Sequence, residues 1–150
     1  MKELSLKEIQ DIELDMLVKF AKFCQENKLH FYLCGGTLLG AIRHQGFIPW
    51  DDDIDVCMPR PDYDRLINNC SLKLSNISLF SSENGNLMVP FAKLKRIDTK
   101  VVSENCRSNI DDKIWIDIFP VDGLPEAVSN QKKLYRKAYI LRALLTLSQG

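Results

Sequence analysis

The sequence predicts an α+β fold in which helices pack against a β-sheet. Residues 5–27 repeat apolar side chains every three or four positions, as an amphipathic helix does. Residues 54–58 alternate apolar and polar side chains, which indicates a strand. Residues 115–119 are apolar around one aspartate, and this pattern also indicates a strand. The 150 residues suit a single domain, 1–150. Twenty acidic residues balance twenty basic ones, so no overall positive field would recruit nucleic acid.

The first helix is predicted from Ser5 to Asn27. Ser5 and Glu8 form the sequence pattern of a capping box, which starts a helix. Lys, Glu and Asp residues are expected on its solvated face, and we expect no chemistry from it. The apolar stripe that would pack on the sheet consists of Ile9, Ile12, Met16, Phe20 and Phe23.

A glycine pair lies between a short strand predicted at 30–34 and a helical turn or two predicted at 38–44. The segment Gly35-Gly36-Thr37 suits phosphate binding, because glycines let backbone N–H groups approach an anion at a helix N-terminus. Taken alone, Gly-Gly-Thr more often marks a tight turn. Arg43 could hold a phosphate or cap the end of the helix, where Gly46 suits the C′ position.

Four aspartates lie within five residues, at positions 51–55. Asp53 and Asp55 would share one face of the predicted strand, roughly 6.5–7 Å apart at Cα. Two such charges repel, and a divalent cation between them removes the repulsion, so we expect a metal site with oxygen ligands, which suits Mg²⁺. A solvated acidic turn or a loose Ca²⁺ site is the alternative, although Val56 stands where a calcium loop requires glycine.

The residues around the acidic segment have simpler interpretations. Trp50 could stack on a base or sugar, but a buried aromatic residue that anchors the strand is favoured. Asp62 and Asp64 are predicted to lie at the N-terminal end of a helix at 62–69 and not to bind metal. A further short strand is predicted at 77–80.

A basic strand is predicted at 89–97. Phe91, Lys93 and Lys95 would share one face of it, and Ala92, Leu94 and Arg96 the other. Among its cations, Lys93, Lys95 and Arg96 are candidates to neutralise a diphosphate. Solvated lysines on an edge strand are the alternative.

Asp117 stands alone among the apolar residues of the strand at 115–119. An unpaired buried carboxylate is unfavourable, so Asp117 needs a partner, and a metal at Asp53 and Asp55 would supply one if the strands are neighbours. Three carboxylates on two strands suit two-metal phosphoryl chemistry. An outward-facing aspartate on a solvated strand face is the alternative.

The last predicted helix, 127–149, is basic on one part and strongly apolar elsewhere. Core packing is the preferred interpretation, although such a surface could also contact an anionic membrane peripherally. The sequence stops directly after it, so we expect a domain cut short of its C-terminal end. No apolar run reaches the ~20 residues of a membrane span, no signal peptide is expected, and five cysteines without a C-x-x-C pattern indicate reduced thiols in a cytoplasmic protein.

The segment from Gly35 to Asp55 resembles the signature of the LicD family, and fukutin-related proteins share it in looser form. The resemblance continues through Met58-Pro59-Arg60, the basic strand Lys93–Arg96 and the block Trp115–Pro125. It implies a nucleotidyltransferase-like mixed β-sheet with helices packed against it. It also implies transfer of a phospho-alcohol from a CDP-activated donor, such as CDP-choline, to a sugar hydroxyl of a surface glycan.

The same resemblance assigns roles to individual residues. Asp53, Asp55 and Asp117 would bind Mg²⁺ or Mn²⁺ as catalytic residues, with the metal bridging the donor diphosphate, and Asp117 would activate the acceptor hydroxyl. The phosphates would be lined by Gly35, Gly36 and Thr37.

The leading hypothesis is therefore a LicD-type phosphotransferase acting in the cytoplasmic assembly of a surface polysaccharide, lipopolysaccharide or teichoic acid. Transfer of a nucleoside monophosphate from an NTP by the same carboxylates is one alternative. A non-catalytic module that binds metal or nucleotide is the other.

Overall fold

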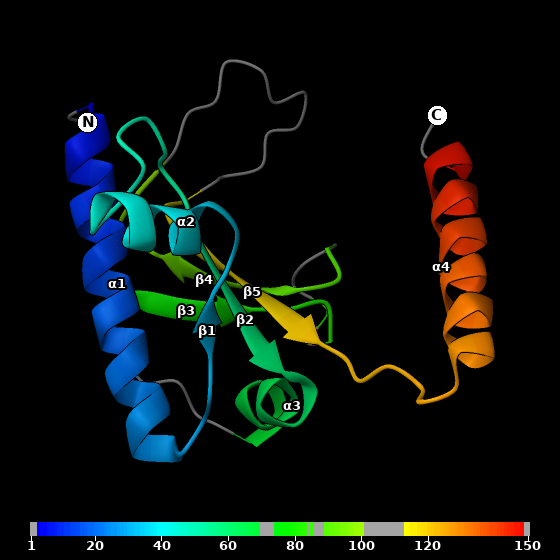
Figure 1. Cartoon of the computed structure of the whole chain (residues 1–150). Coiled ribbons are helices and arrows are strands. Elements are labelled where there is room, and N and C mark those ends of the chain that lie inside the picture. Colours follow the sequence, from blue (N-terminus) through cyan, green and yellow to red (C-terminus); the bar gives the residue numbers. More distant parts are fainter. Residues whose placement is uncertain (1–2, 70–73, 84, 86–88, 101–112, 149–150) are drawn as a thin grey trace.

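The computed structural model describes residues 3–69, 74–83, 85, 89–100 and 113–148. Their fold is α+β, as predicted, with helices around one five-stranded mixed sheet (Figure 1). The sheet order is β1-β2-β5-β4-β3, in which β2 and β5 are parallel and the other neighbours are antiparallel. The strands are β1 (Tyr32–Leu33), β2 (Ile54–Pro59), β3 (Ile77–Phe80), β4 (Ala92–Arg96) and β5 (Trp115–Val121).

One face of the sheet is apolar and buried. On β2 the side chains alternate between buried and half-buried, which confirms the period-two prediction for 54–58. The predicted strand at 115–119 is also confirmed, and β5 begins with the same alternation. Helices α1 (Leu6–Asn27) and α3 (Arg60–Asn69) contribute to the same hydrophobic cluster as this face. The fully buried members include Met16 and Phe20 of α1, Tyr63 and Leu66 of α3, and Ile54, Val56, Leu94, Ile116 and Ile118 of the sheet.

Helix α1 starts at the predicted capping box. The Glu8 amide donates to Ser5 Oγ at 3.3 Å, and the Ser5 amide donates to Glu8 Oε2 at 2.9 Å. Its stripe packs on the core, but the prediction that all its charged residues face solvent is wrong. Gln10 and Glu13 are 8% and 3% exposed.

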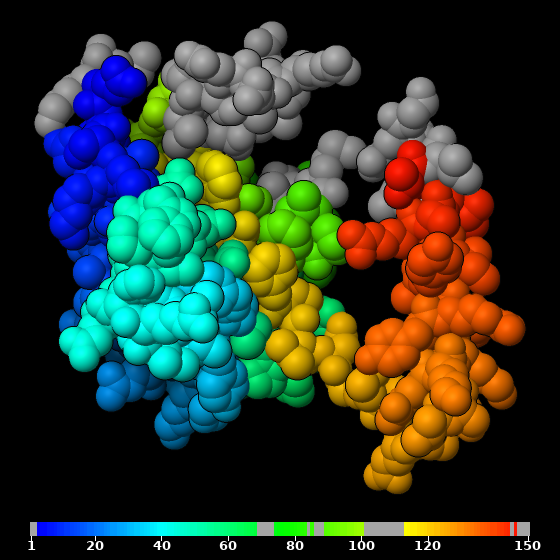
Figure 2. Space-filling model, turned by 45° about the horizontal axis from the view of Figure 1, so that its top comes forward, coloured from blue at the N-terminus to red at the C-terminus, as the bar shows by residue number. Residues whose placement is uncertain are grey.

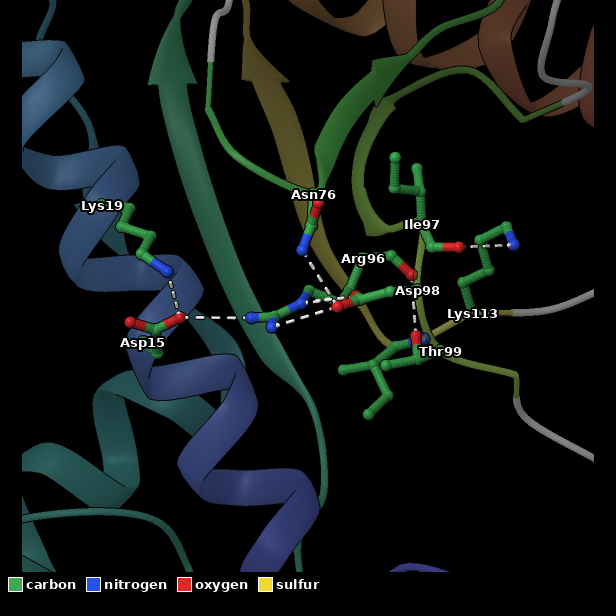
Figure 3. Close-up of polar contacts among 9 residues, drawn as sticks. Asp15, Lys19, Asn76, Arg96, Ile97, Asp98, Thr99 and Lys113 are labelled. Carbon is green, nitrogen blue, oxygen red and sulfur yellow. Dashed lines mark hydrogen bonds and ion pairs between the residues drawn. The ribbon is translucent and has the colours of Figure 1, made fainter. Parts of the chain in front are cut away.

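Arg96 joins α1 to the sheet (Figure 3). Its guanidinium donates to Asp98 at 2.6 Å and to Asp15 of α1 at 3.2 Å, and Lys19 also lies 2.6 Å from Asp15. Arg96 lies on the Ala92 and Leu94 face, as predicted, and is therefore turned away from Lys93. Its contacts assign it to the attachment of the helix, where partly exposed ion pairs contribute modestly.

Two helices begin earlier than predicted. Helix α2 runs from Gly35 to His44, so the glycine pair forms its first turn, and α3 begins at Arg60. The left-handed residue after α2 is Gln45, with φ 54°, and not Gly46. The predicted strand at 30–34 is reduced to β1.

Helix α4 (Val128–Ser148) stands apart from the sheet (Figures 1 and 2). Its described side chains are exposed, apart from half-buried Gln131. Core packing of this helix is not seen among the described residues, and the expectation that it packs on a further part of the domain stays a prediction. None of the described helices combines the length and the apolar character needed to cross a membrane.

Candidate functional site

Asp55 and Asp117 are brought together by the parallel pairing of β2 and β5. Asp55 is the register partner of Asp117, which in turn is the partner of Lys93 on β4. Register partners in neighbouring strands lie about 4.8 Å apart and project from the same face. The three side chains therefore form a row across the face opposite the core. The condition that the strand of Asp117 lies next to the strand of Asp55 is met, and the metal between them stays a prediction.

Lys93 is the counter-ion of Asp117. Its ammonium lies 3.0 Å from Asp117 Oδ1, and both side chains are about 15% exposed (16% and 15%). The ammonium also lies 4.1 Å from the ring centroid of Trp115, whose indole N–H donates to Asp117 Oδ2 at 3.3 Å. Asp117 Oδ1 is buried and, apart from the ion pair with Lys93, has no hydrogen-bond partner among the described residues.

The two alternatives for these charged residues are not supported. Asp117 is not on a solvated face, and Lys93 and Lys95 are not on an edge strand, since β4 lies between β5 and β3. Lys95 is 9% exposed, and its ammonium lies 5.3 Å from the ring centroid of Phe80. Lys93 therefore lies beside the carboxylates, whereas Lys95 is partly enclosed next to an aromatic ring.

Asp53 precedes β2 directly, and its carboxyl belongs to a crowded acidic group. Burial raises the pKa of Asp53 to about 6, with added repulsion from Asp51, Asp55 and Asp52. Burial also raises the pKa of Asp55, and the charges of Asp117 and Asp51 act in the same direction, against the opposing effect of Lys93. Like charges held this close favour protonation or a bound cation.

The glycine pair makes room for two of these carboxylates. A Cβ atom at Gly35 would lie 2.8 Å from Asp55 Oδ2, and one at Gly36 would lie 2.6 Å from Asp51 Oδ2. Gly35 also has φ +55°, which favours glycine. Since the first N–H groups of a helix carry partial positive charge, the start of α2 is a favourable place for these oxygens. Phosphate lining by Gly35 and Gly36 stays a prediction.

Thr37 fixes the start of the acidic strand. Its Oγ1 accepts a hydrogen bond from the Asp55 amide at 2.8 Å, and the Cys34 amide donates to the Asp55 carbonyl at 3.1 Å. These two hydrogen bonds attach the start of α2 to the start of β2. The hydroxyl hydrogen of Thr37 can still be donated to a ligand.

Other predicted residues lie farther from this group. Arg43 is exposed in the last turn of α2, about 12 Å along the helix from Gly35 at ~1.5 Å per residue. Asp62 accepts from the backbone and ring of His30 and from Arg65, which agrees with the predicted helix-end role. Trp50 is 78% exposed, so the prediction of a buried anchor is wrong, and its indole is available to stack on a ligand.

Two polar residues of α1 that the sequence did not reveal as functional reach the acidic segment. Gln10 Nε2 donates to the carbonyl of Asp51 at 2.8 Å. Glu13 is buried, and burial together with the charges of Asp53, Asp52, Asp117 and Asp51 raises its pKa to about 9. Spacing could have revealed Glu13, because it lies four residues after Ile9 and three before Met16, within the apolar stripe.

The donor set fits a hard divalent cation. It offers carboxylate oxygens only, and burial together with the neighbouring aspartates raises the pKa of Asp53 and Asp55. Among the described residues, no group of three or more His, Cys, Asp or Glu side chains is arranged to hold a metal ion. Metal binding by Asp53, Asp55 and Asp117 therefore stays a prediction.

The described cysteines agree with reduced thiols. Cys24 is buried, Cys34 and Cys57 are half-buried, and all three are free. Burial and the neighbouring Cys57 raise the pKa of the Cys34 thiol to about 12. A protonated thiol is a poor nucleophile, so we assign Cys34 no part in the chemistry.

Comparison with known proteins places this geometry in a family. The family described as LicD/FKTN/FKRP, nucleotidyltransferase domain, matches residues 28–141, a range that contains all the predicted site residues. The chain is 37% identical over 131 residues to the lipopolysaccharide cholinephosphotransferase LicD of Haemophilus influenzae, covering 83% of this chain and 47% of that protein. It is 39% identical over 61 residues to an uncharacterised protein of Rickettsia prowazekii, covering 41% of this chain and 20% of that protein. The chain thus spans about half, or less, of the length of these relatives.

Proposed function

The chain belongs to the LicD family, and from this premise we propose that it is a phosphotransferase that moves a phospho-alcohol from a CDP-activated donor to a sugar hydroxyl. Phosphocholine is the group named for the Haemophilus influenzae relative, with lipopolysaccharide as the acceptor. We propose the same substrate class here, with Mg²⁺ or Mn²⁺ as cofactor. The observation that carries the proposal is the register of Asp55 with Asp117, next to Asp53.

The proposed chemistry is a displacement at phosphorus. The acceptor oxygen forms a bond to the phosphorus that carries the alcohol, the bond from that phosphorus to CMP breaks, and the hydroxyl proton passes to a base. A divalent cation held by Asp53, Asp55 and Asp117 would neutralise the diphosphate and stabilise the leaving CMP.

The protein groups position and balance charge in this scheme. Asp117 is the proposed proton acceptor, the role that the family resemblance implies, and it lies on the strand next to Asp55. Lys93 lies beside Asp117 and adds positive charge where the transferring phosphate would lie. The backbone N–H groups at the start of α2 and the Thr37 hydroxyl would orient the phosphates.

The test is product analysis with purified protein, Mn²⁺, CDP-choline and a lipooligosaccharide acceptor. CMP release together with choline-labelled acceptor is the expected result, and Asp55→Asn should reduce it by at least about 100-fold without unfolding the chain. The same reaction with an NTP tests the rival, since the family is described by a nucleotidyltransferase domain. Pyrophosphate release with NMP-labelled acceptor would replace the phospho-alcohol proposal, and donor binding without either product would favour a binding module.

A further inference from the structure

Helix α1 lies against the acidic segment through a polar patch on its otherwise apolar face. Gln10 and Glu13 are three residues apart and therefore on the same side of the helix. Gln10 holds the Asp51 carbonyl, as described above. Both residues lie outside the family match at 28–141, so the resemblance assigns them no role.

Glu13 carries a buried oxygen without a partner. Its side chain is 3% exposed, and its Oε2 has no hydrogen-bond partner among the described residues. Leaving such a group unsatisfied is unfavourable, and a leucine at this position of the stripe would avoid the penalty. Four aspartates, led by Asp53, add repulsion to its carboxylate. Packing of the helix alone therefore gives no reason for a glutamate here.

We propose that Glu13 supplies its carboxylate to the divalent cation of the Asp53–Asp55 site, so that α1 forms part of that site. The inference rests on the proposed function, because it requires a cation at these aspartates. A cation supplies what Glu13 lacks, namely a positive charge and a partner for Oε2. Gln10 then keeps the Asp51 end of the segment fixed over the helix.

The experiment measures Mn²⁺ binding without any donor, by the loss of the free Mn²⁺ signal in electron paramagnetic resonance. The proteins are the wild-type chain, Glu13→Gln and Asp53→Asn. Glu26→Gln is the matched control, because Glu26 is an exposed glutamate on the same helix. We expect Glu13→Gln to raise the Kd for Mn²⁺ at least about 10-fold, as loss of a supporting carboxylate does, and Glu26→Gln to change it less than about 2-fold. Thermal unfolding in EDTA verifies that each variant folds.

The outcomes separate this inference from the proposed function. Loss of binding in Asp53→Asn with unchanged binding in Glu13→Gln overturns the role of Glu13 and leaves the metal site intact. Unchanged binding in both variants, or no binding by the wild-type chain, overturns the metal site and the inference with it. If Glu13→Gln does not fold, Glu13→Asp replaces it, and an unchanged Kd in that shortened side chain overturns the inference.

Discussion

Glu13 should make the metal-free protein less stable as the pH rises. Its pKa is raised from 4.5 to about 9 in the folded state, with burial as the largest cause. Between these values the unfolded chain has lost the proton and the folded chain keeps it. Folding therefore takes up a proton, and the free energy of unfolding falls by about 1.36 kcal/mol per pH unit. From pH 6 to pH 8 this amounts to at most about 2.7 kcal/mol.

Glu13→Gln removes this dependence, because glutamine has the shape of the neutral acid and no proton to lose. The difference in free energy of unfolding between the variant and the wild-type chain should therefore increase with pH. Because some water can reach the carboxylate as the chain relaxes, we expect an increase of about 2 kcal/mol between pH 6 and pH 8, below the upper limit given above. Urea unfolding in EDTA measures it as a difference in midpoint of roughly 1 M, for a slope of about 2 kcal/mol/M. The carboxyl of Asp53, with its pKa raised to about 6, titrates in both proteins and largely cancels. Stability curves that stay parallel from pH 6 to pH 8 would refute a buried, neutral Glu13.

Two substitutions at the start of α2 test how the acidic strand is held. Gly35→Ala should weaken Mn²⁺ binding, because the added Cβ would lie 2.8 Å from Asp55 Oδ2 and displace that carboxylate. Gly85→Ala is the control for backbone strain, because Gly85 also has a positive φ, +71°, but no atom lies within 4 Å of its added Cβ. Equal Mn²⁺ affinities in the two variants would contradict the steric argument. Thr37→Val should lower the free energy of unfolding by about 1–3 kcal/mol in urea titrations, since the Asp55 amide loses its acceptor, and Thr37→Ser should restore it. A valine variant as stable as the wild-type chain would contradict this role of the hydroxyl.

The faces of the strands could be predicted from the sequence because polarity alternates with the pleat. Asp53 and Asp55 are predicted opposite the apolar face of Ile54 and Val56, and the structure confirms that this apolar face is buried. A lone aspartate among apolar residues requires a partner, which makes neighbouring strands a possibility for Asp117 but does not establish them. The structure adds the pairing of β2 with β5, the ion pair of Lys93 with Asp117 and the hydrogen bond from the Trp115 indole.

Strand order and helix polarity could not be predicted in the same way. Local periodicity reports which side chains share a face but not whether a strand lies at an edge, so the edge-strand alternative for Lys95 could not be rejected. Glu13 was assigned to solvent because carboxylates are rarely buried, although the helical period places it within the stripe. Trp50 is predicted to be buried because large aromatic residues usually are, and the structure shows that it is 78% exposed.

These failures share one physical cause, which also supports the proposed site. A buried glutamate, an enclosed lysine and an exposed tryptophan are each unfavourable for folding alone, and they lie in α1, in β4 and directly before the acidic segment. Around Asp117 the nearby carboxylates outnumber Lys93, the one cation that pairs with it among the described residues. Folding alone would not select such an excess of negative charge, whereas a cation-assisted reaction of a diphosphate requires it. Metal affinity should therefore depend on the whole arrangement, including the contribution of α1, and not on Asp53 and Asp55 alone.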